Sequence, residues 1–223
     1  METATPGDSL RRFVTAPLRV GTYKRLLYLL LAFPLGMLYF VGFTVGTSTG
    51  VSLLVTLVGL PILLATLAAT TAAAGLEARL SRALLDMETP APPLLSHPRE
   101  WAVDTDEEGY VAALRRFTLE PTTWTSVGVV LLKFVFGVVT FSVVVIGGVT
   151  VAVLIPAPLV YDSPDTSYRL GSHVVTTLPE ALALSVLGVV GLVVVCNLWN
   201  ALAAVGGVMT DALLSVGRER ETA

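Results

Sequence analysis

Two amide side chains and one charged side chain stand inside long apolar runs of this chain, where each needs either a partner or a function. Asn197 and Asn200 are three residues apart, so both face one way on a helix, and an unpaired amide is costly in hydrocarbon. We expect them to form hydrogen bonds between helices, with a small-ligand contact as the alternative. Lys133 lies inside another apolar run, about 9 Å along a helix from its start. We expect its ammonium group to extend to the membrane surface, although a charge inside a membrane span is also a functional candidate.

A second group of polar residues lies in the connection between two apolar runs. The segment 156–180 contains Tyr161, Asp165, Arg169 and His173. If the protein detects an external ligand, we expect this loop to contact it. An ordinary surface loop is the equal alternative.

A pair of arginines lies on one face of an amphipathic segment. In residues 108–118 the apolar side chains share one face at helical spacing, and Arg115 and Arg116 fall on the other. We expect an interfacial helix whose arginines lie near lipid phosphates and whose surface is available to a partner. The alternative is a solvated helix that packs on the rest of the protein.

Clusters of the kind that enzymatic chemistry requires are missing from the sequence. His97 and His173 are predicted on opposite sides of the membrane, and Cys196 has no histidine or second cysteine near it. The acidic run 104–108 matches no calcium-loop spacing. We therefore predict no catalytic activity, no cofactor and no metal. The net charge of −3 gives no electrostatic case for nucleic acid.

Composition identifies the environment that must position these residues. The 223 residues are 54% hydrophobic and only 14% charged, against roughly a quarter charged in soluble domains. A chain of this length cannot bury such an excess in one core. We predict an all-α integral membrane protein with the lipid bilayer as part of its solvent.

Four uncharged or nearly uncharged runs are long enough to cross a bilayer, which takes roughly 20 apolar residues. They are Leu26–Gly46, Val51–Ala74, Val127–Ile155 and Ala181–Val205. Residues 47–50 are predicted to turn the first pair into a hairpin. Pro61 is predicted to kink the second run.

The basic residues predict the orientation. Of the 14 lysines and arginines, only Lys133 and Arg169 lie outside the N-terminal segment, the long middle loop and the C-terminal tail. Basic residues favour the cytoplasmic side. We expect a multi-pass protein of the cell membrane with both termini and the middle loop in the cytoplasm.

The chain also contains an internal repeat. Leu10-Arg11-Arg12-Phe13 in the first half corresponds to Leu114-Arg115-Arg116-Phe117 in the second. Phe33-Pro34-Leu35-Gly36 corresponds to Phe134-Val135-Phe136-Gly137, and Phe40 corresponds to Phe141. Each half is a short amphipathic helix followed by a membrane hairpin, which predicts parallel repeats.

The predicted organisation follows these halves. The first repeat covers 1–86 and an acidic, proline-rich linker covers 87–107. The second repeat covers 108–217 with its outer loop at 156–180, and the tail is 218–223.

Several of these segments resemble a known family, the prokaryotic "putative sensor" membrane domain. In the first half they are Thr22-Tyr23, Leu26–Leu31, Phe33–Gly36, Leu57–Pro61 and Leu76–Leu85, and in the second Glu120-Pro121, Thr123-Trp124, Pro156–Leu159 and Leu178–Ala181. The resemblance implies a four-span sensory input module that often precedes a histidine kinase or stands alone, with no catalytic residues to carry over. The halves differ at Glu77 and Arg79, because the equivalent positions of the second half hold Gly206 and Val208.

The leading functional hypothesis is a non-catalytic sensory or regulatory module. Because no kinase domain follows the last helix, we expect it to relay an envelope or membrane signal to a separate partner protein. The alternative is a small transporter or channel subunit acting as a homo-oligomer, in which a homodimer would supply eight spans. An intramembrane enzyme and a structural scaffold are the remaining classes.

Overall fold

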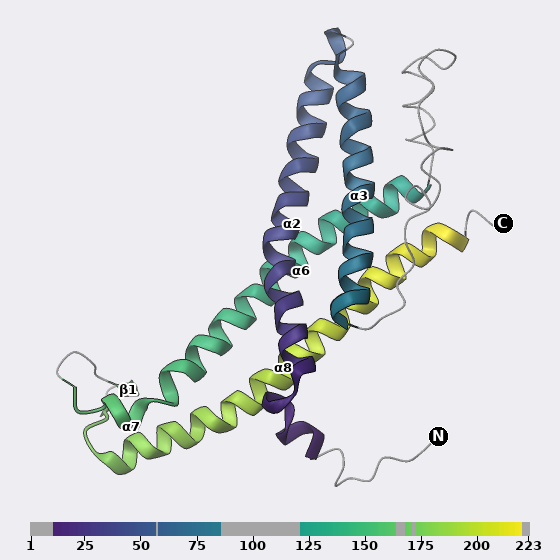
Figure 1. Ribbon diagram of the computed structural model, residues 1–223. Helices are drawn as coiled ribbons and strands as arrows, with labels where there is room; N and C mark the ends of the chain where they lie inside the picture. The colour runs from purple at the N-terminus through teal and green to yellow at the C-terminus, as the bar shows by residue number, and fades with distance from the viewer. Residues whose placement is uncertain (1–10, 57, 86–120, 164–167, 171–172, 220–223) are drawn as a thin grey trace, which may run out of the picture. The chain divides into compact units, whose positions relative to one another are not determined.

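The computed structural model describes residues 11–56, 58–85, 121–163, 168–170 and 173–219. Four long helices dominate: α2 (Val20–Ser52), α3 (Gly59–Leu85), α6 (Pro121–Leu154) and α8 (Leu178–Glu219), shown in Figure 1. The short elements are η1 (Ala16–Leu18), η2 (Leu54–Thr56), α7 (Ala157–Val160), β1 (Arg169–Leu170) and β2 (His173–Val174).

All four long helices are long and apolar enough to cross a membrane. Large apolar side chains stand exposed along them, for example Val45 on α2, Ile146 on α6 and Val186 on α8. A helix that is apolar on its outer faces has lipid as its solvent. The predicted all-α membrane fold with four spans is confirmed.

The chain divides into two compact units; α2, α6 and α8 have residues in both, and α3 lies in one. Unit 1 comprises Met1–Leu26 and Ser142–Ala201; unit 2 comprises Leu27–Phe141 and Leu202–Ala223.

In unit 2, α2 and α3 form the predicted hairpin, but the turn lies later than expected. Residues 47–50 are helical, and α2 continues to Ser52, whose hydroxyl donates to the Ser48 carbonyl oxygen at 2.8 Å. Small hydroxyl residues can remain in a helix by bonding back to the preceding turn. The chain turns between Ser52 and Gly59, where a Cβ on Gly59 would meet the Gly50 carbonyl oxygen, so only glycine fits.

Pro61 does not kink α3, contrary to expectation. The helix begins at Gly59, so Pro61 is its third residue. The first-turn amides of a helix have no carbonyl partner inside the helix, so a proline there removes no hydrogen bond.

In unit 1, the connection between α6 and α8 forms a small packed cap. Its buried residues are Ala157, Val175, Ala181 and Leu184, with Leu154, Tyr161 and Tyr168 packed against them. β1 and β2 pair antiparallel, Arg169 opposite Val174. Glu180 Oε2 accepts hydrogen bonds from the Thr176 and Thr177 amides, which closes the start of α8 as a capping box does.

Candidate functional site: a buried charge cluster

The Lys133 side chain is the centre of a buried polar cluster in unit 2. Lys133 is 0% exposed, and its Nζ donates a hydrogen bond to Tyr28 Oη at 2.6 Å. The same Nζ lies 2.5 Å from Glu77 Oε2 and 4.4 Å from the centre of the Tyr28 ring. Tyr28, Glu77 and Lys133, here called the buried charge cluster, come from α2, α3 and α6.

This corrects the expectation that Lys133 extends to the membrane surface. The helix that carries it begins at Pro121, earlier than the predicted Val127, so Lys133 lies well inside α6. Its side chain reaches a carboxylate on a neighbouring helix instead of the helix end.

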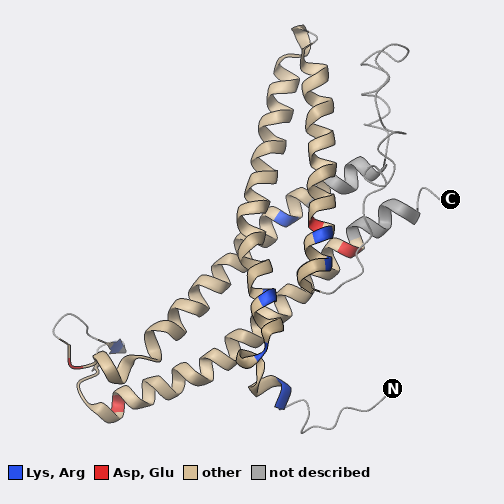
Figure 2. Ribbon diagram, viewed as in Figure 1, with Lys and Arg blue, Asp and Glu red and all other residues tan. Residues whose placement is uncertain are grey.

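Glu77 needs this partner as much as Lys133 does. Its side chain is 1% exposed, and no charged residue precedes it on α3. Removing one member of a buried ion pair leaves an uncompensated charge, which costs about 3–5 kcal/mol. Figure 2 shows the charges of α3 gathered toward its C-terminal end, after a long uncharged stretch.

The cluster leaves some hydrogen-bonding capacity unused. Glu77 Oε2 meets Lys133, whereas Glu77 Oε1 has no hydrogen-bond partner among the described residues. Ser81 Oγ, one helical turn further along α3, and Tyr39 Oη on α2 are also buried without a partner there.

Glycines allow α2 and α6 to approach closely beside the cluster. A Cβ on Gly36 would lie 2.9 Å from the Lys133 carbonyl oxygen, and one on Gly137 would lie 2.5 Å from that of Ala32. Both distances are too short for real side chains, so only glycine fits. The Lys133 backbone is therefore held directly against α2.

Two aromatic stacks flank this crossing. Phe33 stacks on Phe141 with ring centres 4.6 Å apart, and Phe40 stacks on Phe134 at 4.4 Å. In both stacks an earlier residue of one helix meets a later residue of the other, so α2 and α6 run in opposite directions through this crossing.

The contacts at this crossing come in pairs whose members correspond to each other through the sequence repeat. The repeat equates Phe33 with Phe134 and Phe40 with Phe141, so each stack is the counterpart of the other. The Gly36 and Gly137 contacts are counterparts in the same way.

The charged residues of the cluster have no charged counterparts in the repeat. The counterpart of Lys133 is Ala32, and that of Glu77 is Gly206. A Cβ on Gly206 would lie 2.7 Å from the Phe136 ring and 3.1 Å from the Tyr28 ring. The position equivalent to the carboxylate is therefore filled by aromatic side chains.

A cavity of about 610 Å³ lies between α2 and α3 in unit 2. The residues that line it are mostly small or apolar. They include Tyr39, Ala65, Ala69, Ala73, Leu76 and Val130. Ala73 precedes Glu77 by one turn, and Val130 precedes Lys133 by three residues, so both share a helix face with a member of the cluster. The cluster members themselves do not line the cavity, but their neighbours Ala73 and Val130 do.

In unit 1, the two predicted amides hold the N-terminal segment against α8. Asn197 Nδ2 donates to the Phe13 carbonyl oxygen at 2.8 Å. Asn200 Nδ2 donates to Thr22 Oγ1 at 3.1 Å, and that hydroxyl donates to the Ala16 carbonyl oxygen at 2.8 Å. These are the helix-to-helix hydrogen bonds expected from the sequence, and a ligand contact at either amide stays a prediction.

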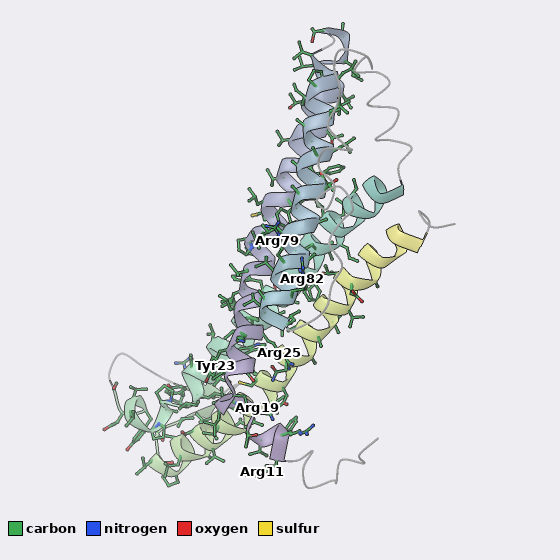
Figure 3. All side chains as sticks on the ribbon, turned by 45° about the vertical axis from the view of Figure 1, so that its right-hand side comes forward. Arg11, Arg19, Tyr23, Arg25, Arg79 and Arg82 are labelled. Atoms are coloured by element: carbon green, nitrogen blue, oxygen red, sulfur yellow. The ribbon has the colours of Figure 1, made fainter. Side chains whose placement is uncertain are left out.

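The segment held by these amides is basic. Arg11, Arg19 and Arg25 are exposed along it, as Figure 3 shows together with Tyr23, whose hydroxyl donates to the Pro17 carbonyl oxygen at 2.8 Å. Cys196 is buried in the same unit, as expected for a small apolar filler.

The other predicted contact residues are placed only in part. Tyr161 packs on the cap of unit 1 and Arg169 is exposed on β1. His173 is described by its backbone in β2 alone, and Asp165, Arg115 and Arg116 lie outside the described residues.

Sequence reasoning missed Glu77 and Tyr28 as members of the site. A signal existed, because a lysine inside an apolar span requires a buried counter-charge. Glu77 stands just past the predicted end of the second span, at Ala74, so hydropathy places it outside the membrane. Helix α3 instead runs without a break from Gly59 to Leu85.

The described residues contain no group of three His, Cys, Asp or Glu side chains able to hold a metal ion. A family model described as "Putative sensor" matches residues 28–214, a range that includes the whole buried charge cluster. The same comparisons find no match among curated proteins or solved structures.

Proposed function

Because this chain belongs to the family described as "Putative sensor", we propose that it is a sensory module that relays a membrane or envelope signal to a separate partner protein. The family suggests a role without catalysis. Four apolar helices make it a multi-pass membrane protein.

The buried charge cluster is the observation that carries the relay. It ties α3 to α2 and α6 by a charge pair, so α3 cannot shift past α6 without separating Glu77 from Lys133. Such a pairing favours a small number of discrete arrangements over continuous movement. A stimulus that changes the packing around Glu77 would therefore switch the position of α3.

The exposed end of α3 offers the output surface. Arg79 and Arg82 follow Glu77 on the same helix and are exposed, as Figure 3 shows. A helix transmits a displacement along its length, so movement at Glu77 also moves these guanidinium groups. An acidic surface of a partner is the complementary contact.

The proposal includes an orientation and a location. We place the protein in the cell membrane with both termini and the middle loop in the cytoplasm, because almost all basic residues lie in those segments. The Arg79 and Arg82 surface then faces the cytoplasm.

It also includes the duplication, with repeats at 1–86 and 108–217 joined by the linker 87–107. The exchanging Phe33–Phe141 and Phe40–Phe134 stacks support it, since two copies of one hairpin would make each contact twice.

Site-specific photo-crosslinking in the native host tests the relay. A photoreactive residue in place of Arg82 should give a protein adduct, and one in place of Leu182, exposed on α8, is the matched control. The adduct at position 82 should fall at least several-fold in the Glu77→Gln variant while the membrane level of the protein is unchanged. Equal adducts at both positions, or an adduct insensitive to Glu77→Gln, would contradict the proposal.

Transport is the second candidate, and the same cluster is what favours it. A carboxylate and an ammonium inside membrane helices are typical of ion and proton pathways. A homo-oligomeric transporter or channel subunit predicts substrate or proton flux in proteoliposomes that Glu77→Gln abolishes. Flux no higher than that of empty liposomes would exclude it.

A further inference from the structure

We propose that the cavity between α2 and α3 binds a lipophilic alcohol from the bilayer, with its apolar body along the helices and its hydroxyl at the buried charge cluster. This names the ligand of the proposed sensory function and rests on that function only for the claim that the ligand is a signal.

The size and walls of the cavity suit an apolar body. Its volume of about 610 Å³ falls within the roughly 300–1,000 Å³ of small-molecule sites. Ala65, Ala69 and Ala73 leave open space along α3, and the wall residue Leu76 is exposed. The hydroxyls of Thr66 and Thr70 also line the cavity, but both donate to carbonyls of their own helix.

The polar end of the cavity specifies the head group. Tyr39 Oη is buried, lines the cavity and has no partner among the described residues, so it offers a donor. Glu77 Oε1, one helical turn beyond the wall residue Ala73, is a buried acceptor that is likewise unused among the described residues. Leaving such groups unsatisfied costs about 1–3 kcal/mol each, so a ligand that satisfies both gains specificity.

A hydroxyl is the smallest organic group that meets both needs. A hydroxyl can accept from a donor such as Tyr39 Oη and donate to an acceptor such as Glu77 Oε1. Charge excludes the other common head groups, because Glu77 and Lys133 already neutralise each other. An added ammonium or carboxylate would bring a net charge into a low-dielectric site.

The route to the cavity lies through the bilayer. The exposed wall residues Leu38, Ala69 and Leu76 belong to membrane-spanning helices whose outer faces are apolar. A ligand dissolved in lipid therefore reaches the cavity without crossing water.

The test is saturable photolabelling of the full chain in lipid nanodiscs with a diazirine derivative of 1-dodecanol. We expect labelled peptides from α2 and α3, with competition by 1-dodecanol and at least five-fold weaker competition by dodecyl methyl ether, which cannot donate. Tyr39→Phe should weaken the alcohol about five-fold, the value of one hydrogen bond. Equal competition by the alcohol and the ether, together with no effect of Tyr39→Phe, would overturn the proposal.

A matched pair of fillers separates the cavity from the lipid-facing surface. Ala69→Phe fills the cavity and should abolish saturable labelling, whereas Ala68→Phe, on the neighbouring exposed position outside the cavity, should leave it intact. Tyr39→Phe removes a single oxygen and keeps the proposal falsifiable if Ala69→Phe fails to fold.

A second copy of the chain is the competing occupant. In a Cys196→Ser background, Ala69→Cys should not form an intermolecular disulfide. Its formation together with absent labelling would overturn the proposal in favour of a dimer contact. Because binding is measured without a partner protein, failure here leaves the relay open, and failure of the crosslinking at position 82 leaves binding open.

Discussion

At the scale of single residues, the pairing of Glu77 with Lys133 predicts opposite results for single and double substitutions. Glu77→Gln or Lys133→Met alone should lower the free energy of unfolding by about 3–5 kcal/mol, because each leaves a buried charge unpaired. The double variant should lie within about 1.5 kcal/mol of the wild type, since both charges are then absent. Reversible denaturation in mixed micelles measures all three.

Arg79→Gln is the control for this cycle. It removes an exposed charge from the same helix and should change the stability by no more than about 0.5 kcal/mol. Strictly additive single substitutions would show that Glu77 and Lys133 are not coupled.

The amides of unit 1 predict a smaller effect. Asn200→Ala and Thr22→Val each remove the Asn200–Thr22 hydrogen bond, and bonds of this kind inside membranes are worth about 0.6 kcal/mol on average. The double-mutant cycle should give a coupling energy of about that size. Thr44→Val, on an exposed position of α2, is the control. A coupling energy of zero would leave the hydrogen bond without a measurable role.

The sequence predicted those residues of the sites whose side chains are unusual for their surroundings, and it could not predict their backbone partners. Asn197 and Asn200 were identifiable, because an amide in an apolar run requires a partner and their spacing places them on one face. Their partners were not, since a backbone carbonyl such as that of Phe13 leaves no mark in a sequence. Glu77 was overlooked because hydropathy ends the second span before it, whereas the helix continues.

At the scale of elements, the crossing of α2 and α6 predicts that its glycines are irreplaceable. Gly36→Ala and Gly137→Ala should each destabilise the protein by about 1–3 kcal/mol, because each added methyl meets backbone of the other helix. Gly128→Ala on α6, with nothing within 4 Å, should be neutral or stabilising by up to about 1 kcal/mol. Thermal unfolding of the three variants in one detergent makes the comparison. The prediction is wrong if Gly36→Ala and Gly128→Ala behave alike.

The existence of the four helices followed from hydropathy, but their ends did not. Hydropathy measures how long a run is apolar, whereas a helix ends where its backbone bonds end. The polar residues 47–50 therefore stayed helical, and α6 begins at Pro121 within a less apolar stretch. Because α6 begins a few residues earlier than hydropathy predicts, Lys133 lies further inside the helix and is buried instead of lying near the membrane surface.

At the scale of the whole molecule, the charge distribution predicts the topology. Reporters fused after Thr105 and after Ala223 should be active only as cytoplasmic fusions, and a reporter after Asp162 only as an external one. An external signal from the Thr105 fusion would reverse the orientation and remove the Arg79 and Arg82 surface from the cytoplasm.

The division of the charge pair between two hairpins also has a consequence for biosynthesis. Ribosomes add roughly 5–20 residues per second, so the hairpin with Glu77 enters the membrane seconds before Lys133 has been translated. During that interval the carboxylate has no cation to meet, and the first hairpin lacks its final position. The arrival of α6 is thus the step that gives the carboxylate its partner, and a chain that stops before Lys133 presents an unpaired acid to the quality-control machinery of the membrane.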